Sequence, residues 1–490
     1  MEIKYTAEDI VNQLKKNGVQ AHAPSKEQRA IIESEHFGPA LIIAGAGSGK
    51  TETMSARVIW LVANGIVAPD EILGLTFTRK AAGELSNRIR TRLRQMNLAG
   101  SATVSTYHSY AGKVLAEHGI RLGIDTDIDP IGEAAAWQIA NKIVTNFESE
   151  LPDIVHSPKT IVDKVLDLVD QLGEHGKDLA ELESISHSWL AKFESVSVGS
   201  NAGFRRAIES LKERLALVPM IERFNKERFE NGQLTFSDQM SLAAKLVNSE
   251  FREDIARAER AKYKIVLLDE YQDTSYSQVR FLTGLYGGDS SLGIHSVTAV
   301  GDPNQSIYGW RGANLNNILE FEHDFPRVRV VRLEQNYRST KAIVHAAGAL
   351  IDHNKQRKKK TMVTDNPQGD PVSVVTFDNG VAEAEGVVER IKEAVKGGRF
   401  RYRDHAIFLR IDALSRSQVL RFCQIVSPFA PHIAEELWSV LGHATLLADT
   451  TWPEADRSLV VDESVKIAVQ VNGKLRGTIE LPRDTGEADA

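Results

Sequence analysis

The stretch ALIIAGAGSGKT, residues 40–51, decides the fold class. Its first five residues are apolar, as in a buried strand, and the residues after it have their apolar positions at helical spacing. The glycines between them allow backbone N–H groups to approach phosphate oxygens at the start of a helix. We therefore predict a strand, a phosphate-binding loop and a helix, with Lys50 reaching the β- and γ-phosphates and Thr51 binding Mg²⁺. A glycine-rich turn without a ligand is the alternative.

Five more short apolar runs are bounded by turn or cap residues, as buried parallel strands are. Several are followed by helical spacing, so we predict an open α/β sheet. Helical spacing with few strand signals over about 111–226 predicts a helical insertion in that domain. The runs lie at residues 71–78, 102–108, 264–270, 296–302 and 330–335.

Two later segments have a different character. Residues 371–378 and 404–410 are strand-like, with a helix-like segment between them, and predict the beginning of a second α/β unit. The last 80 residues combine a helix-like segment with an alternating segment, in which the pair Asn472-Gly473 favours a hairpin turn. We therefore predict a small α+β tail.

Composition limits the class of protein. The 490 residues carry a formal net charge of −7, with 42% hydrophobic and 26% charged residues, as in ordinary globular proteins. The single cysteine, Cys423, excludes an intrachain disulfide and a cysteine-based zinc site. No apolar run approaches the length of a membrane span, so we expect a cytoplasmic protein with no membrane partner. Residues 411–490 hold 12 acidic and seven basic residues, so the tail carries most of the negative excess.

LLDEYQD, residues 267–273, places two carboxylates at the end of an apolar run. Phosphoryl transfer needs neutralised charge and an aligned nucleophile, so we predict that Asp269 holds Mg²⁺ and Glu270 positions or deprotonates the attacking water. Acidic residues at the end of a strand are more often solvated or capping. The phosphate-binding loop elsewhere in the chain favours the catalytic interpretation.

GDPNQSIYGWRGA, residues 301–313, follows another predicted strand. Gln305 is a candidate contact of the γ-phosphate, and Tyr308 and Trp310 are candidates for stacking on unpaired bases. QNYRS adds Tyr337, a further ring for stacking, and Arg338, a permanent cation for a phosphate. Packing in the core is the alternative for the rings, and an ordinary surface charge for the arginine.

Taken in order, these motifs resemble superfamily 1 DNA helicases of the UvrD, PcrA and Rep type over about residues 20–415. The resemblance implies a RecA-like parallel sheet of the P-loop NTPase class, with ATP and Mg²⁺ as cofactors. It also implies single-stranded or partly duplex DNA as substrate. Family loops begin with alanine, as Ala44 does here, and PSKEQ ends at Gln28, which resembles the glutamine that reads adenine.

The same resemblance implies roles for individual residues. LTFTRKAAGEL and STYHS resemble the single-strand contact motifs, although Arg79 replaces the commoner Asn and Tyr107 the commoner Phe. Trp310 would stack on a DNA base, Tyr337 on adenine, and Arg338 would touch the γ-phosphate. The implied DNA contacts are Phe77, Thr78, Arg79, Tyr107, His108, Tyr308 and Trp310. The implied nucleotide contacts are Gln28, Ala44, Gly45, Ala46, Gly47, Ser48, Gly49, Lys50, Thr51, Arg311, Tyr337 and Arg338.

The last part of the chain resembles another family. From about residue 419, LRFCQIVSPFAPHIAEELW and VQVNGKLRG resemble the anticodon-binding, carboxy-terminal region of leucyl-tRNA synthetase. The helicase motifs that follow in the family do not occur in this sequence, so we expect a truncated motor joined to this fragment. The predicted parts are a first RecA-like domain (1–110 and 227–340), an inserted helical subdomain (111–226), a partial second RecA-like domain (341–418) and the tail (419–490).

Three functions follow as expectations. The first is an ATP-dependent, 3′ to 5′ DNA helicase with a role in DNA repair and a possible repair-complex partner, impaired in turnover and unwinding by the truncation. The second is a nucleotide-dependent DNA-binding module that does not unwind. The third and least favoured is a tRNA-binding adaptor through the tail, because a net negative segment binds polyanions poorly.

Overall fold

The structure is a computed structural model that divides into two compact units, Met1–Val372 and Ser373–Ala490. Each unit is considered by itself. The residues described are 3–19, 21–35, 38–124, 130–147, 156–194, 202–288, 296–355, 358–398, 400–408, 464–471 and 474–482.

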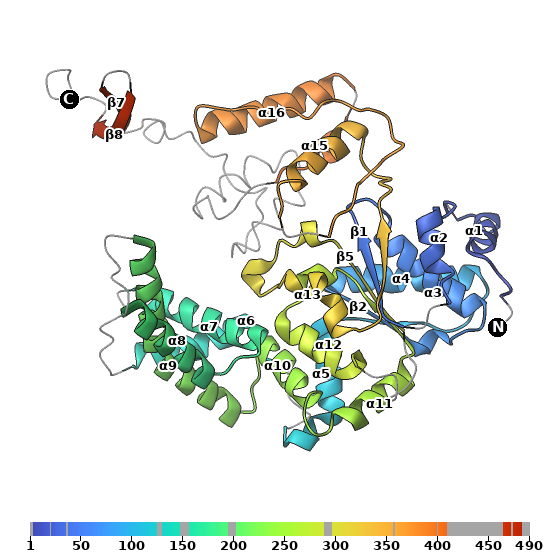
Figure 1. The fold of residues 1–490 in the computed structure, drawn as a ribbon, viewed down its shortest axis with the longest axis horizontal. Coiled ribbons are helices and arrows are strands. Elements are labelled where there is room, and N and C mark those ends of the chain that lie inside the picture. Colours follow the sequence, from blue (N-terminus) through green and yellow to red (C-terminus); the bar gives the residue numbers. More distant parts are fainter. Residues whose placement is uncertain are drawn as a thin grey trace, which may run out of the picture. The chain divides into compact units, whose positions relative to one another are not determined.

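The first unit is built on a six-stranded sheet in the order β3-β2-β4-β5-β1-β6, with every neighbouring pair parallel (Figure 1). All six strands predicted from the sequence are confirmed within two residues. Successive side chains of a strand point to opposite faces, and both faces are covered by helices, so a continuous apolar run is required. The strands are β1 Ala40–Ala44, β2 Ile72–Thr76, β3 Thr103–Thr106, β4 Ile265–Leu268, β5 Ser296–Gly301 and β6 Arg329–Leu333.

Helices pack on both faces of this sheet (Figure 1). On one face, Ile42 and Leu267 belong to the same hydrophobic cluster as Trp60 and Leu93. The helices of this face are α1 Ala7–Lys16, α2 Lys26–Ile32, α3 Lys50–Ala63 and α4 Arg79–Gln95. Those of the other face are α5 Tyr107–His118, α10 Phe236–Leu246, α11 Arg252–Lys262, α12 Tyr276–Tyr286, α13 Asn316–Leu319 and α14 Phe321–Asp324.

The predicted helical insertion has a hydrophobic cluster of its own, centred on Val162, Ile221 and Phe224. Its helices are α6 Glu133–Thr145, α7 Pro158–His175, α8 Leu179–Glu194 and α9 Ala202–Glu230, which lie beside the sheet domain in Figure 1. The boundary predicted at residue 111 falls inside α5, whose buried side chains pack with the sheet. By packing, the insertion therefore begins at α6.

The strands predicted at 371–378 and 404–410 are wrong over their described residues, which contain no strand. Val374 and Phe408 are each 93% exposed. A strand needs a hydrogen-bonded neighbour, and none of the described residues pairs with these two segments. The helix expected between them is present as α16, Gly380–Lys396. Before it in the chain, α15 spans Lys341–Ile351.

The predicted hairpin of the tail is confirmed. β7, Ser464–Val471, pairs antiparallel with β8, Lys474–Pro482, and Val471 lies opposite Lys474. The turn residues Asn472 and Gly473, and the helix-like segment that begins at residue 420, lie outside the described residues. No helix in the described part of the chain is long and apolar enough to cross a membrane.

Candidate functional site

The loop between β1 and α3 has the backbone that its glycines predict. Gly47 and Gly49 have φ angles of 73° and 78°, a region that L-residues rarely adopt. A Cβ atom on Gly47 would lie 2.8 Å from Cβ of Arg338, and one on Gly49 would lie 2.9 Å from Nε2 of Gln28. Side chains are thus excluded at these two positions, and the first N–H groups of α3 have no partner within the helix. It has the form of an anion cradle at a helix N-terminus.

Lys50, the first residue of α3, extends toward the end of β4. Its Nζ lies 2.9 Å from Oε2 and 3.2 Å from Oε1 of Glu270, and the lysine side chain is only 12% exposed. Glu270 itself has φ 48°, which turns the chain sharply at the strand end. The sheet places β4 two strands from β1, so the cation and the carboxylate predicted from distant motifs meet.

Asp269 is 5% exposed, and the hydroxyl of Tyr107 donates to its backbone oxygen at 2.9 Å. Burial raises the pKa of the Asp269 carboxyl to about 6, with a further increase from Glu270 that Lys50 opposes. Asp273 is also raised to a pKa of about 6, mainly by burial and then by Glu270. A divalent cation beside the desolvated Asp269 carboxyl would stabilise its ionised form.

A pocket of about 460 Å³ opens beside the loop and is lined by Gly47, Gly49, Gln28, Tyr337 and Arg338. Its volume suits a small-molecule ligand. The Gln28 amide donates to the Ser48 oxygen at 3.2 Å, which fixes this glutamine against the loop. The rest of the lining includes apolar side chains of α1, such as Ile10 and Leu14. A largely apolar pocket that has the exposed Tyr337 ring in its lining and lies next to the phosphate cradle fits a nucleotide base.

Asn336 of QNYRS is a site residue whose role the sequence does not indicate. Its side chain donates to the Ala46 oxygen at 2.7 Å and accepts from the backbone N–H groups of Arg338 and Ser339. The backbone N–H of Tyr337 donates to the Gly47 oxygen at 2.8 Å. QNYRS is therefore attached directly to the loop, which places Tyr337 and Arg338 at the pocket with exposed side chains.

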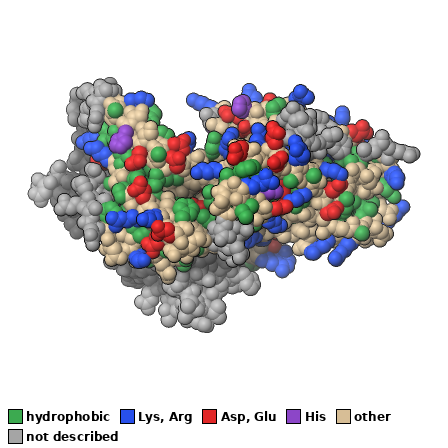
Figure 2. All heavy atoms as spheres, turned by 90° about the horizontal axis from the view of Figure 1, so that it is seen from below, with side chains coloured by type: hydrophobic (Ala, Val, Ile, Leu, Met, Phe, Trp, Pro, Cys, Tyr) green, Lys and Arg blue, Asp and Glu red, His purple; other side chains and the backbone are tan. Residues whose placement is uncertain are grey.

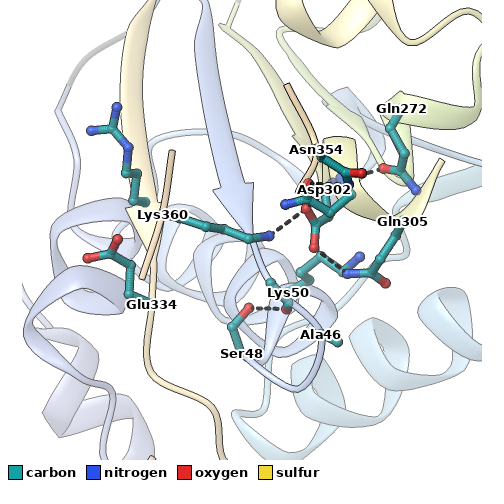
Figure 3. A network of polar contacts seen from close by, with 12 residues as sticks. Ala46, Ser48, Lys50, Gln272, Asp302, Gln305, Glu334, Asn354 and Lys360 are labelled. Carbon is teal, nitrogen blue, oxygen red and sulfur yellow. Dashed lines mark hydrogen bonds and ion pairs between the residues drawn. The ribbon is translucent and has the colours of Figure 1, made fainter. Parts of the chain in front are cut away.

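A polar network joins Gln272, Asp302 and Gln305 (Figure 3), and Gln272 connects it to Glu270. The amide of Gln272 donates to Glu270 at 2.9 Å, and its oxygen accepts from the backbone N–H of Asp302 at 3.0 Å. Gln305 then donates to Asp302 Oδ2 at 2.7 Å. No pattern in the sequence indicates this role of Gln272, because these contacts are set by the fold.

The rings predicted for DNA contact form what we call the aromatic shelf: Phe77, Tyr308 and Trp310. Phe77 stacks on Tyr308 with centroids 5.1 Å apart, and Trp310 is 71% exposed and lies 6.4 Å from Tyr308. The Arg311 guanidinium lies 4.7 Å above the Trp310 ring. Arg311 thus extends the shelf, and no contact in the described structure joins it to the phosphate cradle.

Other predicted DNA contacts have different surroundings. Tyr107 is 1% exposed, packs in the hydrophobic cluster on one face of the sheet and donates to the Asp269 oxygen, so its burial leaves no ring face for the predicted contact with nucleic acid. His108 lies 3.7 Å from Glu174 of α7, Thr78 caps α4, and Arg79 is exposed beside Thr78. On the face in Figure 2, basic and acidic side chains are interspersed, without a field of one sign.

Comparison with known proteins identifies the family. Residues 24–326 match the profile of the UvrD/REP helicase N-terminal domain. The chain belongs to the UvrD/REP helicase family. Residues 331–425 match the UvrD-like helicase C-terminal domain, and residues 387–489 match the anticodon-binding domain of tRNA ligase. The two later matches overlap over 387–425, which includes the join predicted near residue 419.

Curated relatives carry helicase names. The ATP-dependent DNA helicase PcrA of Leuconostoc citreum is 31% identical over 393 residues, 80% of this chain and 47% of the relative. The probable DNA helicase II homolog of Rickettsia conorii is 30% identical over 413 residues, 82% of this chain and 56% of the relative. PcrA of Bacillus subtilis is 31% identical over 390 residues. This member of the UvrD/REP family spans about half the length of the relatives it matches.

Proposed function

We propose that this chain is the ATP-binding part of an ATP-dependent DNA helicase of the UvrD type, with Mg-ATP and single-stranded DNA as ligands. The observation that carries the proposal is the meeting of Lys50 with Glu270 at the glycine cradle, next to the 460 Å³ pocket. The relatives named ATP-dependent DNA helicase support it.

The residues suit hydrolysis of a terminal phosphate, in which water forms a bond to phosphorus and the bond to the leaving diphosphate breaks. Lys50 and the backbone N–H groups of the cradle would hold the phosphates, and Glu270 would orient the water and take its proton. Gln305 and Arg338 would contact the γ-phosphate. Thr51 and Asp269 would hold Mg²⁺, which neutralises charge on the phosphate oxygens.

The base of the nucleotide would enter the pocket between Gln28 and Tyr337. Amide groups such as that of Gln28 pair with the edge of adenine, and an exposed ring such as Tyr337 can stack on its face. The aromatic shelf would stack on bases of single-stranded DNA, with Arg311 adding a cation beside Trp310. Movement from 3′ to 5′ and a role in a repair complex follow from the family alone.

The decisive test is DNA-stimulated ATP hydrolysis by the full chain. Lys50→Ala should reduce the stimulated rate at least about 100-fold, because the phosphates lose their buried cation. Lys159→Ala is the matched control, since Lys159 is an exposed lysine of α7 paired with Asp163, and it should keep the wild-type rate. Equal rates for wild type and Lys50→Ala would show that this loop does not bind the phosphates during hydrolysis and would contradict the proposal.

A second candidate is a nucleotide-dependent DNA-binding module that does not unwind DNA. The phosphate cradle, the pocket and the aromatic shelf would each bind a ligand without any need for turnover. ATP affinity and strand binding without strand separation, in a fluorescent unwinding assay, are then expected, and robust unwinding would reject this alternative. Saturable tRNA binding that is lost on deleting residues 419–490 would instead favour an adaptor role for the tail.

A further inference from the structure

We infer that Lys360 is a positioning residue for nucleotide hydrolysis, which fixes Asp302 and, through it, Gln305 beside the phosphate cradle. The inference rests on the proposed ATPase function and adds a residue from outside the motifs recognised in the sequence. The observation behind it is a buried ion pair between Lys360 and Asp302, to which neither the sequence motifs nor the family match assigns a role.

Lys360 and Asp302 form this pair with an Nζ–Oδ1 distance of 2.5 Å, and each side chain is only 4% exposed. A buried ammonium ion and a buried carboxylate are each costly alone, so each depends on the other. Burial lowers the pKa of Lys360, and Asp302 opposes that effect. In Figure 3, Lys360 reaches Asp302 from one side while Gln305 reaches it from the other.

Asp302 contacts two residues of the phosphate site, Gln305 and Gln272. Its Oδ2 accepts from the Gln305 amide at 2.7 Å, and its backbone N–H donates to the Gln272 oxygen at 3.0 Å. Gln272 in turn donates to Glu270, the carboxylate that holds Lys50. A shift of Asp302 would therefore move the proposed γ-phosphate contact and the residue proposed to orient water.

The backbone next to Lys360 is fixed by residues 361–363, which contact the end of β6 and the phosphate cradle. Val363 exchanges backbone hydrogen bonds with the strand end, accepting from Asn336 at 2.7 Å and donating to Glu334 at 2.9 Å. The N–H of Thr361 donates to the Glu334 carboxylate at 2.8 Å. Met362 lies so close to Gly45 that a Cβ there would meet its sulfur at 2.2 Å. The lysine thus stands on a fixed backbone, as a positioning group must.

The test compares Lys360→Met, Lys360→Arg and Lys359→Met in the full chain. Lys359 is the matched control, because it is exposed and its hydrogen bond from Arg332 is accepted by the backbone oxygen, which methionine also has. Lys360→Met should lower kcat of DNA-stimulated hydrolysis by about 10- to 100-fold, as misplacement by about 1 Å does, while KM for ATP changes less than about threefold. Lys360→Arg should restore at least part of kcat, and Lys359→Met should match wild type. An unchanged kcat in Lys360→Met, or a rise in KM alone, would overturn the inference.

The double variant Lys360→Met with Asp302→Asn separates positioning from folding, because it leaves no unpaired buried charge. It should unfold near the wild-type Tm yet remain slow, since Gln305 has lost its carboxylate partner. Wild-type turnover in the double variant would mean that the pair is only structural and would overturn the inference.

Failure of the proposed function would look different. If wild type and Lys50→Ala hydrolyse ATP equally, the ATPase proposal fails. Measurements of nucleotide binding then still test whether Lys360 positions the phosphate contacts. Lys360→Met should then weaken binding of ADP with aluminium fluoride at least about tenfold while ADP affinity is kept, because only the former resembles a transferring phosphate. Equal effects on both ligands, or none, would overturn the inference.

Discussion

Asp269→Asn should stabilise the nucleotide-free protein at neutral and alkaline pH. Asp269 is buried at the end of β4, and burial raises its pKa from 3.8 to about 6. At about 1.36 kcal/mol per pKa unit, ionising this group in the folded state costs about 3 kcal/mol. Asparagine keeps the oxygen that accepts the Glu270 N–H at 3.0 Å, so the substitution removes the charge and little else.

The sign of the pH dependence follows from the raised pKa. Between about 4 and 6 the folded state binds more protons at Asp269 than the unfolded state does, so stability falls as pH rises through this window. Above about 6 the loss is complete, whereas below 3.8 the carboxyl is neutral in both states. The difference between the variant and wild type should therefore be near zero at pH 4 and grow to about 3 kcal/mol at pH 7.5.

Urea unfolding of both proteins without nucleotide or Mg²⁺, at several pH values from 4 to 8, measures this difference. Glu253→Gln is a suitable control, because Glu253 is an exposed carboxylate of α11 and should change stability by no more than about 0.5 kcal/mol. Mg²⁺ with nucleotide should reverse the order, since wild type gains a ligand for the cation. An Asp269→Asn variant less stable than wild type at pH 7.5 would refute the reasoning.

Two further predictions concern the ligands. Tyr337→Ala should weaken nucleotide affinity about tenfold, because a base–ring stack is worth about 1 to 3 kcal/mol, while Tyr337→Phe should keep it in a fluorescent-nucleotide titration; equal losses in both variants would remove the stack. Trp310→Ala should weaken binding of a single-stranded oligonucleotide by about 5- to 100-fold with nucleotide affinity unchanged, for the same reason. Loss of nucleotide affinity in Trp310→Ala would mean that this ring contacts the nucleotide and would contradict its assignment to DNA binding.

Much of the first unit was predictable because its signals are local. The strands β1, β2, β4 and β5 are buried on both faces. An apolar run such as ALIIA, between a turn and a helix, therefore indicates a strand. The parallel order then brings strand ends together, which is why Lys50 and Glu270 meet although 220 positions separate them. The phosphate loop, the carboxylates at the end of β4 and Trp310 could also be recognised from short sequence motifs.

The rest depends on contacts that residue type does not reveal. Lys360 ends a run of three lysines, a pattern typical of solvated surface, and only the fold buries it against Asp302. Tyr107 has a ring of the kind that contacts nucleic acid, yet it is buried in the hydrophobic cluster on one face of the sheet, with its hydroxyl on the Asp269 oxygen. Residues 371–378 have the alternation of a strand, but a strand forms only where a neighbour accepts its hydrogen bonds.

The order of the strands also has a consequence for how the protein is made. β1 is the second nearest strand to one edge, and both of its partners, β5 and β6, come more than 250 residues later in the chain. At about 5 to 20 residues per second, a ribosome that has synthesised Lys50 needs roughly 15 to 60 s more to reach Arg338. Until β5 has been synthesised, β1 has no hydrogen-bonding partner in the sheet. In the emerging chain, α3 is an early partner for the apolar side chains of ALIIA. The QNYRS segment can contact the phosphate loop only after nearly all of the first unit has been made.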